Sequence, residues 1–110
     1  MLTGGIRTRD QAHALLREGA ADAVGLARAM ALDPNLPAKW LAGPEGPTFP
    51  RFTETPPGGV TAWYSMRLTA LGEDAEDRFD MAVPEALAAY GARDAARCEL
   101  WRKRFTSAVA

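Results

Sequence analysis

A run of prolines and glycines near the middle of the chain most strongly limits what this sequence can fold into. The stretch GPEGPTFPRFTETPPGG, residues 43–59, holds five prolines and four glycines. Proline removes a backbone donor and glycine favours turns, so no regular helix or strand can run through this stretch. We therefore expect a long loop or linker over residues 44–59, between an N-terminal region, residues 1–43, and a C-terminal region, residues 60–110.

Composition and charge exclude several classes of protein. The chain has 110 residues, of which 47% are hydrophobic and 25% charged, with a formal net charge of -1. This size allows one small domain, and this charge favours neither a nucleic-acid nor an anionic-membrane partner. The sequence contains no run of about 18 apolar residues, so no membrane span is predicted. Cys98 is the only cysteine, which excludes an internal disulfide and predicts a reducing, cytoplasmic setting.

The first region reads as a strand, a helix and a second strand. Thr8 and Gln11 have the spacing of a capping box, which predicts a helix that begins at residue 9 and stops at Gly19. Short apolar segments at Leu2–Thr3 and at residues 23–26 flank this helix as strands. The sequence therefore predicts a compact parallel βαβ unit with a right-handed crossover.

Helices are expected in the rest of the chain. Asp33 as the N-cap and Pro34 as the first helical residue predict a short helix that ends at Gly43. A second helix is expected over residues 60–72, followed by an acidic loop, and a long helix from Pro84 to residue 105. The apolar residues expected to pack are Leu36, Trp40 and Leu41 in the short helix and Leu87, Tyr90, Cys98, Trp101 and Phe105 along one stripe of the last helix.

Two parallel strands alone form a poor sheet. Each strand leaves an unpaired edge, and parallel strands are normally buried on both faces inside larger α/β folds. The chain offers no further strand candidates. We infer that neighbouring strands are missing from this sequence, so that Met1 is an internal residue of a longer protein and the exposed strand edges favour self-association.

Two loops have the composition of phosphate-binding loops. Gly4 and Gly5 follow the first strand and precede a helix, where backbone N–H groups and the helix dipole favour an anion. Ala27 and Arg28 follow the second strand, where a small residue allows close approach and a guanidinium offers a fork of donors. Taken alone, the glycine pair is equally consistent with a plain tight turn, whereas an arginine such as Arg28 directly after a strand more often forms a surface ion pair.

Together the two loops predict a specific fold. Neighbouring parallel strands bring both loops to the same edge of the sheet. In (β/α)8 barrels that edge holds the active site, and phosphate is often bound by the loops after strands seven and eight. The expected fold class is therefore α/β, a C-terminal fragment of a TIM barrel with its last two parallel strands, followed by a helical C-terminal tail.

Residues 1–43 also resemble a known family. The turn TGGIRT, the strand GAADAVGLAR and the helix start DPNLP resemble, in order and spacing, the last two barrel units of the NADH:flavin oxidoreductase, or old yellow enzyme, family. The segment GGVTAWYSMRLTALGED and the last helix are similar to C-terminal tails of some bacterial members.

This resemblance implies FMN as cofactor and NAD(P)H as hydride donor. Gly4 and Gly5 would offer backbone N–H groups to the FMN phosphate, and Ala27 and Arg28 would bind the phosphate after the last strand. Many members of the family have glycine where Ala27 stands, so its side chain is expected to crowd the phosphate slightly. The residues that hold the substrate and donate the proton lie on earlier strands in this family, so no catalytic residue is assigned here.

Other reactive or aromatic side chains are better explained by structure. His13 lies mid-helix, and Tyr64, Tyr90 and Cys98 fit packing positions. The three tryptophans are expected to be core or interface anchors. The acidic loop around residues 73–77 lacks metal-ligand spacing, so no metal site is predicted.

Two hypotheses remain open. In the first, the chain is the C-terminal fragment of an FMN-dependent NAD(P)H oxidoreductase, a flavoprotein of ene-reductase type, and contributes the phosphate-binding loops. Without the catalytic half we expect no turnover and little change in flavin fluorescence on adding FMN. In the second, the chain is a standalone, mostly helical, non-enzymatic interaction module. Whether the chain is itself an enzyme is left open.

Overall fold

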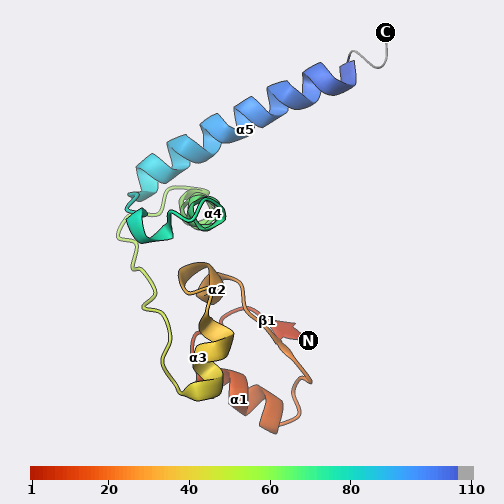
Figure 1. Ribbon diagram of the computed structural model, residues 1–110, viewed down its shortest axis with the longest axis vertical. Coiled ribbons are helices and arrows are strands. Elements are labelled where there is room, and N and C mark those ends of the chain that lie inside the picture. The colour runs from red at the N-terminus through yellow and green to blue at the C-terminus, as the bar shows by residue number, and fades with distance from the viewer. Residues whose placement is uncertain (107–110) are drawn as a thin grey trace. The chain divides into compact units, whose positions relative to one another are not determined.

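A computed structural model describes residues 1–106 of the chain, which are mostly helical (Figure 1). They form two compact units, the first spanning Met1–Arg51 and the second beginning at Phe52. The elements of the first unit are β1 (Leu2–Thr3), α1 (Arg9–Arg17), β2 (Val24–Gly25), α2 (Arg28–Leu32) and α3 (Leu36–Ala42). Those of the second are α4 (Gly59–Gly72), the 3₁₀ turn η1 (Glu76–Arg78) and α5 (Val83–Thr106). The last four residues of the expected C-terminal region, 107–110, lie outside the described part.

The expected TIM-barrel fragment is wrong. Helices make up 58% of the structure and strands 4%, and the two strands are two residues long. They pair in parallel, with Leu2 opposite Val24 and Thr3 opposite Gly25. The ladder is short because Gly4 and Gly5, at φ +99° and +72°, turn the chain directly after Thr3. A barrel unit needs a longer strand than this, so the α/β assignment gives way to a mostly helical fold.

Local signals placed α1 correctly. The Thr8 hydroxyl accepts from the Gln11 amide at 3.2 Å, and the Gln11 side chain accepts from the Thr8 amide at 3.1 Å. Gly19, at φ +70°, follows the last turn, and its N–H donates to the Leu16 carbonyl at 3.2 Å. The capping box and the glycine stop are therefore confirmed.

The role expected of Asp33 is wrong. Asp33 ends the short helix α2, and Asn35 is the N-cap of α3. The Asp33 carboxylate instead accepts from the Asn35 amide at 3.1 Å and from Lys39 Nζ at 2.5 Å. Asp33 therefore stabilises the turn between the two helices, which is a common use of an aspartate side chain before a helix.

The first unit has its own hydrophobic core. Its buried members are Ile6, Ala12, Ala29, Leu36 and Trp40. Phe49 is half-buried and packs against the same cluster, although no helix or strand forms over residues 43–58. Trp40 is a core residue as expected, whereas Leu41 is 88% exposed and does not pack. The irregular segment is therefore part of the first unit up to residue 51.

The second unit is built around aromatic rings. The Trp63 ring makes edge contacts with the rings of Phe52, Tyr64 and Phe79 at centroid distances of 5.4, 5.0 and 5.1 Å. Its Nε1 also donates to the Met81 carbonyl at 2.9 Å. This cluster ties α4 to the chain on both sides of it.

Helix α5 is covered over its first half only. Val83 and Ala86 are buried, and Arg93 donates to the Thr69 hydroxyl at 2.6 Å. From residue 94 to residue 106 every residue is exposed. The stripe of apolar residues therefore packs as expected near its start. Cys98, Trp101 and Phe105 are exposed instead, and the rings of Trp101 and Phe105 contact each other at a centroid distance of 4.9 Å. None of the helices in residues 1–106 is long and apolar enough to cross a membrane.

Candidate functional site

The glycine turn follows β1 and leads into α1. Both glycines adopt positive φ, which L side chains rarely adopt. A Cβ atom at either glycine would meet no atom within 4 Å. The glycines are therefore required by the backbone conformation and leave open space beside the turn.

The second loop follows β2 and leads into α2. Ala27 is the N-cap of α2 and makes no side-chain capping bond, and Arg28 is the first helical residue. The Thr3 hydroxyl donates to the Gly25 carbonyl at 3.0 Å. This bond and the ladder hold the two loops beside each other at the carboxyl ends of both strands.

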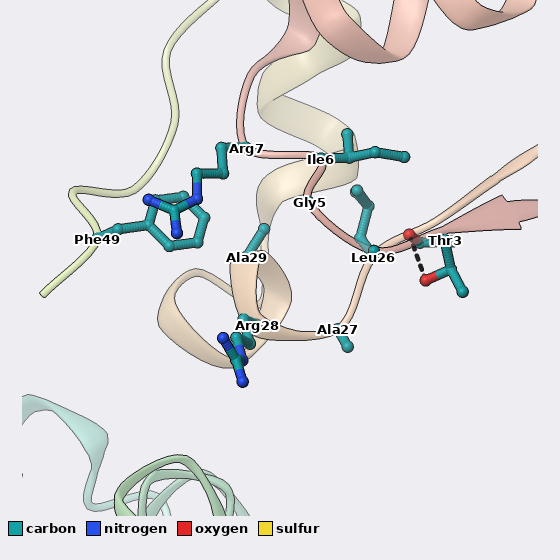
Figure 2. A pocket seen from close by; sticks show the side chains of 11 residues that line it. Thr3, Gly5, Ile6, Arg7, Leu26, Ala27, Arg28, Ala29 and Phe49 are labelled. Atoms are coloured by element: carbon teal, nitrogen blue, oxygen red, sulfur yellow. Dashed lines mark hydrogen bonds between the residues drawn. The ribbon is translucent and has the colours of Figure 1, made fainter. Parts of the chain in front are cut away.

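One pocket of about 350 Å³ lies between the two loops (Figure 2). Among its lining residues are all four that the sequence singled out, namely Gly4, Gly5, Ala27 and Arg28. The short parallel ladder thus brings together two loops that are more than twenty residues apart in sequence. This is the arrangement that a shared binding site requires.

The lining also includes two residues that sequence reasoning did not select. Arg7 and Phe49 lie at the same pocket, with the Arg7 guanidinium carbon 4.9 Å from the centre of the Phe49 ring. Arg7 belongs to the TGGIRT turn, so its closeness to the glycines was a usable signal. Phe49 comes from the irregular segment, where no periodicity indicates what a side chain contacts.

The chemistry of the pocket favours an anion. Its remaining lining residues are Thr3, Ile6, Gly25, Leu26 and Ala29. The described lining therefore holds two guanidinium groups and no carboxylate. Guanidinium N–H groups match the geometry of phosphate or carboxylate oxygens, so this arrangement can bind and orient an anionic group.

The other residues weighed in the sequence lie outside this pocket. His13 and Cys98 are exposed, Tyr64 is buried and Tyr90 is half-buried. Among residues 1–106 no cluster of three or more histidine, cysteine, aspartate or glutamate side chains could hold a metal ion.

Comparison with known proteins found no matching family model, no similar curated protein and no similar solved structure.

Proposed function

We propose that the chain is a binding module whose first unit holds the phosphate group of a phosphorylated ligand. The observation that carries this proposal is that the Gly4–Gly5 turn, Ala27 and Arg28 line one pocket. Backbone amides at a glycine turn and a guanidinium are the donors that proteins use for phosphate. A volume of about 350 Å³ is in the range of small-molecule sites, so phosphate would be one end of a larger ligand.

FMN is the ligand to test first, because residues 1–43 resemble the phosphate-binding end of FMN-dependent NAD(P)H oxidoreductases. The glycine turn and Arg28 would contact the phosphate, and Ala27 is small enough to let it approach. FMN, when bound, supplies hydride transfer between NAD(P)H and an acceptor. The part of this chain in such chemistry is to bind and orient the phosphate end. We also propose that the protein works in a reducing, cytoplasmic compartment, because it has a single cysteine.

The proposal is tested by titrating the ¹⁵N-labelled chain with FMN, riboflavin and inorganic phosphate. FMN and phosphate should shift the backbone amides of Gly4, Gly5, Ala27 and Arg28, whereas riboflavin, which lacks the phosphate, should not. The substitution Arg28→Ala should raise the dissociation constant of FMN about tenfold or more, because a charge-assisted hydrogen bond contributes about 1.5–3 kcal/mol.

Arg17→Ala is the matched control, since Arg17 carries the same charge in the last turn of α1 and does not line the pocket. It should bind FMN like the unaltered chain. Equal shifts with FMN and riboflavin, or unchanged FMN affinity in Arg28→Ala, would contradict the phosphate site.

A second candidate function rests on the exposed end of α5. Leu100, Trp101 and Phe105 are 66%, 63% and 46% exposed and line a shallow groove with Arg97 and Arg104. Exposed aromatic and arginine side chains are typical of interaction surfaces. This supports the hypothesis of a mostly helical, non-enzymatic module that associates through such surfaces.

Analytical ultracentrifugation tests this second candidate. If the α5 groove is the contact, concentration-dependent association should be lost in Trp101→Glu and kept in Leu2→Glu, which alters the exposed edge of β1. Loss in Leu2→Glu alone would assign the contact to the strand edge, and a monomer at all concentrations would contradict self-association.

A further inference from the structure

Arg7 and Phe49 form a stacked pair that lines the pocket. The guanidinium carbon of Arg7 lies 4.9 Å from the centre of the Phe49 ring, and both residues line the pocket with Gly5 and Arg28. Figure 2 shows the flat Arg7 guanidinium lying against this ring. The pair therefore belongs to the site and not to a separate surface.

The backbone of Arg7 is held in place from both sides. Ile6, directly before it, is a buried core residue, and Thr8, directly after it, is the N-cap of α1. The Arg7 N–H donates to the Gln11 side-chain oxygen at 2.8 Å. The start of the Arg7 side chain is thus fixed by the capping box, whereas the side chain itself is exposed.

Phe49 supplies a support for that exposed side chain. Its ring is half-buried against the core of the first unit, and Pro50, the next residue, restricts the backbone of Phe49 itself. Stacking uses the flat face of a guanidinium and leaves its edge N–H donors available for an anion. A guanidinium that is already oriented loses less conformational freedom when it binds.

We infer that Arg7 is a second anion-binding residue of this pocket and that Phe49 is its positioning residue. Arg7 and Arg28 then approach the anionic group from two loops, which increases the preference for a phosphorylated ligand over its unphosphorylated form. This inference rests on the proposed phosphate site. It adds Arg7, which lies in the TGGIRT turn, and Phe49, which comes from the irregular segment and which no sequence motif indicated.

The alternative is that the pair only packs residues 43–51 onto the core. In that case Phe49 would contribute to folding, and its replacement would change stability without changing anion affinity. A double-mutant cycle measured on binding separates the two explanations, because only a positioning role makes the effect of Phe49 depend on Arg7.

The experiment measures the dissociation constants of FMN and inorganic phosphate for the full chain and for Arg7→Ala, Phe49→Leu, Phe49→Tyr and the double variant Arg7→Ala/Phe49→Leu. Arg7→Ala should weaken both ligands about tenfold or more. Phe49→Leu keeps the apolar packing and removes the ring, so it should weaken them about two- to fivefold. Phe49→Tyr keeps an aromatic ring, so it should bind both ligands with the affinity of the unaltered chain. The double variant should bind them no more weakly than Arg7→Ala alone.

The two proposals fail in different ways. Unchanged FMN affinity in Arg7→Ala, with a loss in Arg28→Ala, overturns the role of Arg7 and leaves the phosphate site standing. No loss in either variant overturns both. Unchanged affinity in Phe49→Leu assigns Phe49 to packing alone. Additive losses in the double variant mean that Phe49 affects binding independently of Arg7, which also overturns its role as positioning residue.

A second measurement does not depend on the fold of any variant. In the unaltered chain, the Phe49 ring should shift the Arg7 Nε–H resonance away from its usual position, and phosphate should shift it further. The Arg17 Nε–H resonance should show neither shift. An Arg7 resonance that does not respond to phosphate would contradict the inference.

Discussion

Gly59 and Gly91 both lie in helices of the second unit, and their surroundings are opposite. A Cβ atom on Gly59 would lie 2.6 Å from Val83 Cγ1 and 3.2 Å from side-chain carbons of Pro56. A Cβ atom on Gly91, in the middle of α5, would meet nothing within 4 Å. The first glycine therefore allows the start of α4 to touch the start of α5, whereas the second only weakens its helix.

Alanine substitution should separate these two roles. Gly59→Ala forces Val83 or Pro56 to move and should lower the free energy of unfolding of the second unit by about 1–3 kcal/mol. Gly91→Ala should raise it by about 0.5–1 kcal/mol, because alanine is a better helix former. Urea unfolding followed by the Trp63 indole resonance measures both, and effects of the same sign would contradict this account of Gly59.

At the scale of elements, α5 shows that a helix can form without being covered. Its 24 residues continue past the point where Arg93 meets Thr69 of α4. Beyond that point Glu99 and Lys103 form an exposed i,i+4 pair at 3.8 Å, a kind of contact that contributes only about 0.3–0.5 kcal/mol. The two tryptophans of the second unit differ in the same way. Trp63 in α4 is surrounded by other rings, whereas Trp101 in α5 is 63% exposed.

Replacing each tryptophan by alanine tests that difference. Trp63→Ala removes three ring contacts and the bond to Met81 and should cost about 3–5 kcal/mol. Trp101→Ala removes an exposed side chain and should change the free energy of unfolding by less than about 0.5 kcal/mol. Thermal unfolding followed by far-ultraviolet circular dichroism measures both. A large loss in Trp101→Ala would mean that the end of α5 is covered in solution.

The sequence predicted those elements whose signals are local. The Thr8–Gln11 pair, Gly72 and Pro84 lie within one turn of the helix ends that they indicate. Helix α2 was missed because five residues are too few for a periodic pattern. The periodicity of α5 indicates which residues share a face, but it carries no information about whether another element covers that face.

The candidate site was predictable to the extent that it depends on the ladder. Parallel pairing of two strands is enough to bring the Gly4–Gly5 turn beside Ala27 and Arg28. The TIM-barrel prediction went wrong at the same point, since loops of this kind need only a two-residue ladder. Phe49 was beyond prediction because a contact from an irregular segment depends on tertiary packing alone.

At the scale of the whole molecule, each unit has a hydrophobic core made from its own residues. In the first unit, Leu36 is the largest fully buried side chain, at 0% exposure, and it packs with Ile6 and Trp40. In the second unit, the core consists of the rings around Trp63 and the contact between α4 and α5. A unit of about 50 residues is stable by only a few kcal/mol, so loss of one large side chain is a large fraction of that stability.

Leu36→Ala should therefore unfold the first unit and leave the second folded. The substitution should cost about 2–5 kcal/mol, and the Trp40 indole resonance should collapse to its unfolded position. The Trp63 resonance should stay dispersed, because the ring contacts and hydrogen bond described for Trp63 are made to residues of the second unit. Leu41→Ala is the matched control in the same helix, since Leu41 is 88% exposed, and it should alter neither resonance. Collapse of both resonances in Leu36→Ala would show that the two cores unfold as one, and the phosphate pocket would then depend on the stability of the entire chain.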